Sequence, residues 1–256
     1  MTRTIAIINQ KGGSGKTTTT VNLAATLGKQ GRRVLVLDLD PQASATNWLG
    51  IKDGGRGLFD VFSDGLAVTG LIQPTTAEGV EIIPSSTWLI GVEKALAGKV
   101  GAESVLKQAL ASLKESWQYI LIDCPPTLGI LATNALVAAK EVLVPVECHV
   151  MGLGGLARLI QAIKLIKEQL NPEIELTGIV ASRFDTRTRH AHEVVEQLRS
   201  RFGPLVYETV IRENIRLAEC PSFALPIIRY DPFSSGAVDY RKLAHDVVMQ
   251  ESRLPA

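Results

Sequence analysis

Short runs of apolar residues alternate along the chain with longer segments in which apolar residues recur every three or four positions. The runs have the length of buried strands, and the recurring pattern is typical of helices with one buried face. Strands that alternate with helices favour a parallel sheet covered by helices on both faces. The expected strands are residues 5–8, 33–38, 80–84, 119–123, 142–147 and 174–182.

Helices are expected between these strands. The first follows a glycine-rich segment and ends near Gly28 and Gly31, because glycine is common where a helix stops. Residues 50–79 are rich in glycine and show little periodicity, so most of this stretch is expected to be loop. The other expected helices are residues 58–62, 102–115, 154–170, a segment that ends near 202, and 237–249.

The glycine-rich segment lies between the first strand and the first helix, which is the order that a phosphate-binding loop needs. Glycines let backbone N–H groups converge on an anion, and the helix N-terminus adds a partial positive charge. In such a loop Lys16 reaches the β- and γ-phosphates and the Thr17 hydroxyl binds Mg²⁺. The predicted nucleotide-binding residues are Lys11, Gly12, Gly13, Ser14, Gly15, Lys16, Thr17 and Thr18.

Aspartates follow two of the expected strands, at the edge of a parallel sheet where ligands bind. Asp123 ends an apolar strand, which is the Walker B arrangement for a carboxylate that holds Mg²⁺ directly or through water. Asp38 and Asp40 follow another strand, and we expect a structural role for Asp38. We assign Thr17, Asp40 and Asp123 to the metal.

Composition excludes several classes of protein. The 256 residues are 46% hydrophobic, which is enough for one large domain or two, and the net charge of +1 requires any nucleic-acid binding to come from a local patch. The three cysteines are widely spaced and suggest neither a disulfide framework nor a zinc site. No apolar stretch is long enough to cross a bilayer and no secretory leader is visible, so a soluble cytoplasmic protein is expected.

The loop departs from the common phosphate-loop pattern, because Gln10 stands where that pattern has glycine and Lys11 adds a second lysine. The sequence Lys-Gly-Gly-Ser-Gly-Lys-Thr resembles the deviant phosphate loop of the ParA/MinD ATPases. In that family the first lysine reaches across a dimer interface to the partner's nucleotide, which implies this role for Lys11. Taken alone, Lys11 could also be an ordinary solvated lysine.

Further motifs resemble the same family in the same order. Asp-Leu-Asp-Pro-Gln at residues 38–42 implies that Asp40 activates water, and Asp-Cys-Pro-Pro at residues 123–126 resembles a switch that senses the γ-phosphate. The resemblance runs from residue 4 to about residue 248. It implies that residues 1–256 form a single P-loop ATPase domain without an N-terminal helix-turn-helix extension, with ATP and Mg²⁺ as cofactors. Its catalytic residues would be Lys11, Lys16 and Asp40.

Arginines in the last third of the chain have two interpretations. On charge alone, those near residues 183–201 could form a solvated helix face. The resemblance instead places Arg187 and Arg216 at DNA-contacting positions of the family. Arg212 stands where the family often has a proline that packs on the base, and we assign it with Arg183 to the nucleotide. The family commonly has glutamine near Glu147 and acidic or aromatic residues around His149, which we expect to face the surface or a dimer partner.

The resemblance implies an ATP-dependent homodimer that binds DNA nonspecifically on the nucleoid and segregates a chromosome, a plasmid or another cargo. A ParB-like partner would stimulate hydrolysis. A MinD-like ATPase that acts on the membrane is the alternative, but residues 250–256 are too polar for its C-terminal amphipathic helix. A relative of the nitrogenase iron protein would need cluster-bridging cysteines, and Cys124 and Cys148 lack that spacing. A ligase-type relative would use the same ATP site for synthesis.

Overall fold

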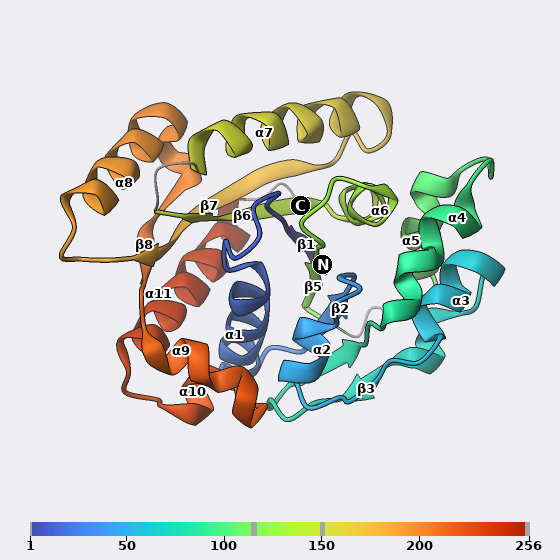
Figure 1. The fold of residues 1–256 in the computed structure, drawn as a ribbon, viewed down its shortest axis with the longest axis horizontal. Helices are drawn as coiled ribbons and strands as arrows, with labels where there is room; N and C mark the ends of the chain where they lie inside the picture. The colour runs from blue at the N-terminus through green and yellow to red at the C-terminus, as the bar shows by residue number, and fades with distance from the viewer. Residues whose placement is uncertain (1, 114–116, 149–151, 254–256) are drawn as a thin grey trace.

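A computed structural model of the chain describes residues 2–113, 117–148 and 152–253. Its strands are β1 (Arg3–Ile7), β2 (Val34–Asp38), β3 (Gln73–Pro74), β4 (Val80–Ile83), β5 (Tyr119–Asp123), β6 (Glu141–Glu147), β7 (Glu175–Phe184) and β8 (Val206–Arg212). They form one sheet in the order β3-β4-β2-β5-β1-β6-β7-β8 (Figure 1). All of the pairings are parallel except that of β3 with β4.

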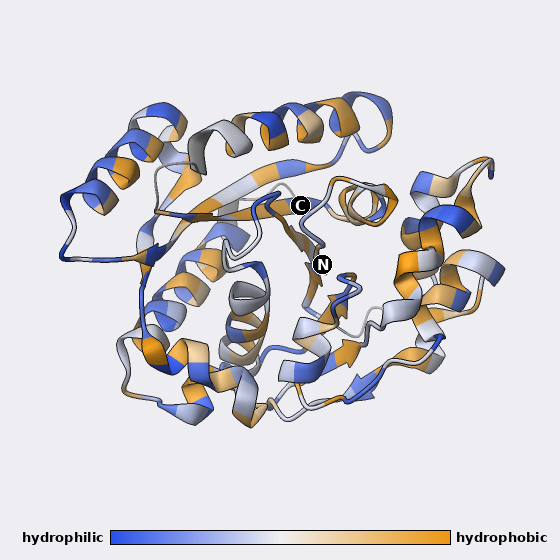
Figure 2. Ribbon diagram, in the orientation of Figure 1, coloured by the Kyte–Doolittle hydropathy of each residue, from blue (hydrophilic) through white to orange (hydrophobic). Residues whose placement is uncertain are grey.

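Alternating side chains of the strands supply two hydrophobic layers. Ile5 and Ile7 of β1 belong to one layer, and Ala6 and Ile8 belong to the other. The first layer is covered by α1 (Lys16–Lys29), α2 (Ser44–Trp48), α9 (Ile215–Glu219), α10 (Ile227–Tyr230) and α11 (Ser235–Met249). The second is covered by α3 (Gly57–Asp64), α4 (Val92–Leu96), α5 (Val105–Ala111), α6 (Ile130–Ala138), α7 (Gly152–Gln169) and α8 (Arg189–Phe202). Figure 2 shows hydrophobic colour along the central strands and mixed colour along the outer helices.

The predicted α/β fold class is confirmed, with a mostly parallel sheet and helices on both faces. All six expected strands are present, and the sheet also contains the short strand β3 and the edge strand β8, which the apolar runs did not predict. The predicted helix over residues 102–115 is wrong in its bounds. Its start is a 3₁₀ turn, because the Asn134 side chain accepts from the Leu106 N–H and donates to the Ala102 carbonyl. The α-helix itself ends at Ala111.

Register places the polar ends of the strands together. Asp123 of β5 is paired with Ile7 of β1 on one side and with Asp38 of β2 on the other. Glu147, at the end of β6, is paired with Ser182 of β7. Since these strands are parallel, their carboxyl ends meet at one edge of the sheet, beside the loop that joins β1 to α1.

Candidate functional site

The loop between β1 and α1 has the backbone shape of a phosphate cradle. Gly13 and Gly15 have φ values of 74° and 87°, a left-handed conformation that residues with a side chain rarely adopt. The end of β7 supports the loop, because the Ser182 hydroxyl donates to the Ser14 carbonyl at 2.8 Å. The loop ends at the first residue of α1, so the N-terminus of a 14-residue helix points toward it.

Asp123 links α1 to the sheet. Its Oδ2 accepts a hydrogen bond from the Thr17 hydroxyl at 2.7 Å, and its Oδ1 lies 3.1 Å from the Thr20 hydroxyl. The Lys16 side chain is buried, and its Nζ lies 3.4 Å from the carbonyl oxygen of Lys11. The structure therefore brings together Lys16, Thr17 and Asp123, as the sequence predicted.

Asp38 has the structural position that was expected of it. Its buried Oδ2 accepts from both the backbone N–H and the hydroxyl of Thr46, at 2.8 and 2.7 Å. Its Oδ1 accepts from the N–H of Asp40 at 3.1 Å, which fixes the turn that carries Asp40. The Asp40 side chain accepts from the Gln42 N–H and remains partly exposed at the edge of the sheet.

Burial of the two neighbouring carboxyls dominates the electrostatics of the site. Burial raises the pKa of Asp123 well above the ordinary carboxyl range, and the adjacent Asp38 raises it further. The pKa of Asp38 is also raised, again mainly by burial. Burial lowers the pKa of Lys16, against the opposing effect of the Asp123 and Asp40 charges. Such a site favours a ligand that brings its own positive metal ion beside the carboxyls.

Lys11 lies at the mouth of the loop and is paired within its own subunit. Its Nζ is 2.6 Å from Oε2 of Glu147, and Oε1 of the same carboxylate is 3.2 Å from Arg183. Arg183 also approaches Glu213 at 3.5 Å. Among the described ion pairs, Glu147 therefore connects Arg183, a predicted nucleotide residue, to Lys11 of the loop. The sequence gave no reason to assign a role to Glu147.

The two arginines assigned to DNA are exposed and lie outside the loop site. Arg187 is 83% exposed, and its guanidinium makes two hydrogen bonds to Asp185 at 2.9 and 3.0 Å. Arg216 is 55% exposed and lies 3.0 Å from Glu219. Each arginine therefore has a carboxylate neighbour within its own segment, and both side chains are accessible from solvent.

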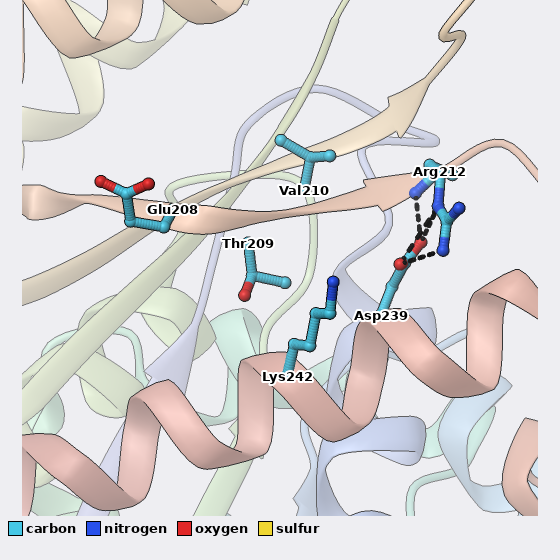
Figure 3. Close-up of a pocket in the computed structure, with 6 residues that line it drawn as sticks. All are labelled: Glu208, Thr209, Val210, Arg212, Asp239 and Lys242. Atoms are coloured by element: carbon cyan, nitrogen blue, oxygen red, sulfur yellow. Dashed lines mark hydrogen bonds and ion pairs between the residues drawn. The ribbon is translucent and has the colours of Figure 1, made fainter.

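Arg212 lies at the end of the edge strand β8. Its guanidinium contacts the buried carboxylate of Asp239 on α11, with Nη2 2.6 Å from Oδ1 (Figure 3). This pair lines a surface pocket that shares no residue with the phosphate loop. The expected stacking of Arg212 on a base stays a prediction. To stack on a base, the Arg212 side chain would have to leave Asp239 or move together with it.

The residues present fit a nucleotide and its metal ion. The Ser14 hydroxyl is buried in the loop and has no hydrogen-bond partner in the described part of the chain. Thr17 and Asp123 provide the small set of oxygens that Mg²⁺ takes from proteins when phosphates and water complete its shell. Among the described residues no cluster of three or more histidine, cysteine or acidic side chains could hold a metal by itself.

Comparison with known proteins agrees with this geometry. The model of a family described as an AAA domain matches residues 2–176. The chain is 43% identical to the sporulation initiation inhibitor protein Soj of Bacillus subtilis, over 96% of this chain and 98% of that protein. It is 42% identical to the chromosome partitioning protein ParA of Myxococcus xanthus, over 98% and 89% of the two chains. The chain belongs to the ParA/Soj family of P-loop ATPases.

A solved structure extends this result to the ligands. Cobyrinic acid a,c-diamide synthase of Mycobacterium smegmatis, with bound ADP and magnesium, has 32% identity and a TM-score of 0.86, over 98% of this chain and 96% of that one. ATP and Mg²⁺ are accordingly the cofactors of this ParA/Soj-family ATPase, as predicted.

Two further residues of this ParA/Soj-family chain bear on the sequence-based predictions. Asn9 was missed: its amide donates to the Pro145 carbonyl, and its Oδ1 accepts from the Lys11 N–H at 3.0 Å. A polar residue that follows the apolar run of the first strand, three positions before the first glycine of the loop, is the sequence signal for this contact. His149, for which a surface or dimer-facing position was expected, lies outside the described residues.

The buried carboxyls predict how pH changes the stability of the nucleotide-free ATPase. In the folded protein Asp123 keeps its proton up to a higher pH than in the unfolded chain, where the carboxyl releases it above its ordinary pKa of about 4. The free energy of unfolding should therefore decrease as pH rises from about 4 toward neutrality. For each proton that the folded state retains, the free energy of unfolding decreases by at most about 1.4 kcal/mol per pH unit. Asp123→Asn removes the titrating group at nearly the same size, so its stability should fall less over this range.

Urea unfolding without Mg²⁺ measures the free energy of unfolding of the wild type and of Asp123→Asn. The measurements cover pH values from about 4 to about 8, roughly the interval between the ordinary and the raised pKa of Asp123. Wild-type protein that gains stability relative to Asp123→Asn as pH rises would show that the folded state prefers the charged carboxylate.

Proposed function

We propose that this ATPase forms an ATP-dependent homodimer that binds DNA nonspecifically and positions a chromosome, a plasmid or another cargo. It would act in the cytoplasm, on the nucleoid, and a ParB-like partner would stimulate hydrolysis. The observation that carries the nucleotide site is the 2.7 Å contact between Thr17 and Asp123, at the start of a helix that follows a glycine loop. A relative that is named as a chromosome partitioning protein matches 98% of this chain.

Each residue of the loop region has a proposed task. The N–H groups of Gly12, Gly13, Ser14, Gly15 and Thr18 would surround the phosphates, and Lys16 would pair with the β- and γ-phosphates. Bound Mg²⁺ would neutralise phosphate charge. Thr17 and Asp123 would hold the metal, with Asp40 nearby. Asp40 would orient the attacking water, and its partly exposed position at the sheet edge leaves its carboxylate accessible.

Dimerisation is proposed to depend on Lys11. The side chain is 38% exposed at the mouth of the loop, whereas Lys16 is buried beneath it. Lys16 is therefore placed to act within its own subunit, and Lys11 is placed to reach an anion that approaches from outside. In a face-to-face dimer that anion would be the partner's nucleotide.

DNA binding is assigned to Arg187 and Arg216, whose exposed guanidinium groups would contact phosphates. Phosphate contacts carry no sequence information, which suits a nonspecific strip. Arg183, between the loop and the segment that carries Arg187, would help to hold the nucleotide site in place.

The MinD-like alternative has less support. The two relatives reported above are named as the sporulation inhibitor Soj and as a chromosome partitioning protein, and they match 96% and 98% of this chain. In the described part of the chain, no helix is both long and apolar enough to span a membrane.

Substitution of the two lysines separates nucleotide binding from dimerisation. Lys16→Ala should weaken ATP binding by more than about tenfold, because a charged partner of the phosphates is removed. Lys11→Ala should still bind nucleotide as a monomer but should not form ATP-dependent dimers. Titration with a fluorescent ATP analogue measures the first property, and light scattering measures the second. ATP-dependent dimers of Lys11→Ala would exclude the cross-subunit role.

Reversal of the two exposed arginines tests the DNA strip. Arg187→Glu combined with Arg216→Glu should abolish DNA retention, while ATP binding, dimerisation and basal hydrolysis persist. In the single variant Arg187→Ala, the salt dependence of binding should decrease by about 0.9 in log–log slope for each phosphate that the variant no longer neutralises. Filter binding over a salt series measures both effects.

The control is Lys29→Glu with Arg33→Glu, which reverses the same number of charges at exposed positions before β2. It should retain DNA. If the double arginine variant binds DNA like this control, the strip lies elsewhere, for instance at Arg199 and Arg201. If the arginine variant fails to dimerise, the two arginines have a structural role instead.

A further inference from the structure

A buried carboxylate at the end of β6 holds two cations of the site. Glu147 has only 8% of its side chain exposed, and its two oxygens lie 2.6 Å from Lys11 and 3.2 Å from Arg183. A carboxylate at this depth is costly unless it is paired, and it is much more costly if a partner is removed. Glu147 therefore has a strong requirement for positive charge beside it.

The backbone around this carboxylate is fixed on both sides. Asn9 ties the Lys11 N–H to the Pro145 carbonyl of β6, and the Cys148 N–H donates to the Ser182 carbonyl of β7. Arg183 follows directly and has a φ of 50°, in the left-handed region that is unfavourable for a residue with a side chain. This conformation accompanies the placement of its guanidinium between Glu147 and Glu213.

Among the described ion pairs Lys11 has one anionic partner, and it is proposed to bind a different one in the dimer. In the free subunit its ammonium group is bound to Glu147, whereas the dimer described above needs the same group at the partner's phosphates. Movement of Lys11 would leave Glu147 with Arg183 as its remaining cation among these contacts. The cost of breaking the first pair is thus part of the free energy of dimerisation.

We propose that Glu147 is an intramolecular latch that holds Lys11 in its own subunit and so sets the ATP and protein concentrations at which the dimer forms. The inference rests on the proposed function, since it assumes that Lys11 acts across the interface. Glu147 is a positioning residue in this account. Its release of Lys11 makes dimerisation a switch between two ion pairs of the same lysine.

Glu147→Gln tests the latch, because glutamine keeps the size and one hydrogen-bond acceptor but removes the charge. A neutral hydrogen bond is about half as strong as a charge-assisted one, so the protein concentration for half-maximal dimer with saturating ATP should fall by about tenfold. Glu147→Asp keeps the charge and should dimerise much closer to wild type. Analytical ultracentrifugation with a slowly hydrolysed ATP analogue measures these thresholds.

Two comparisons make the result specific to Lys11. Glu213→Gln removes the other carboxylate beside Arg183. Because Glu213 makes no ion pair with Lys11 among the described residues, this variant should leave the protein concentration for half-maximal dimer unchanged. Reductive methylation of the free subunit, read by mass spectrometry, reports on the latch without dimerisation. Lys11 should react slowly in wild type and faster in Glu147→Gln, even if that variant is less stable.

The outcomes separate the latch from the function on which it rests. An unchanged threshold in Glu147→Gln, or unchanged methylation of Lys11, would overturn the latch while leaving the cross-subunit role intact. A higher threshold would also overturn it, since Glu147 would then support the dimer. Normal dimerisation of Lys11→Ala would overturn the proposed function itself.

Discussion

The hydrogen bonds between the Asp123 carboxyl and the hydroxyls of Thr17 and Thr20 connect the sheet to the first helix. They fix the N-terminus of α1, and hence the loop before it, at the edge where the parallel strands end. The same carboxyl is fully buried beside Asp38, which makes its charged form unfavourable until a cation approaches. The fold therefore places a helix N-terminus, a lysine and a buried carboxyl around one point.

A second property of the structure is that the three cations proposed to bind the partner's nucleotide or DNA are already paired with carboxylates. Lys11 pairs with Glu147, and Arg187 and Arg216 pair with Asp185 and Glu219. Each proposed anionic ligand therefore approaches a cation that already has a carboxylate partner. Competition from these carboxylates should make the binding of phosphates weaker than the number of cations alone suggests. The pairing also agrees with the net charge of only +1.

The sequence predicted the parts of the structure that depend on local pattern. Apolar runs located the buried strands. The order of the motifs also predicted that Lys16, Thr17 and Asp123 lie together, because the carboxyl ends of parallel strands meet at one edge of the sheet. The edge strand β8 was missed, since only one of its sides is paired and its residues alternate in burial. The Lys11–Glu147 pair and the Asn134 contacts that shape the start of α5 join segments far apart in the chain. No local pattern specifies such contacts.

Mixed dimers of two inactive variants test whether Lys11 completes the active site of the opposite subunit. Lys11→Ala and Asp40→Ala should each be inactive in hydrolysis alone. In a mixed dimer, one site would have its own Asp40 together with Lys11 from the partner, so a mixture of the two variants should hydrolyse ATP well above the sum of the separate rates. If Lys11 acts within its own subunit, no site in the mixture is complete. A mixed rate equal to that sum would contradict the account.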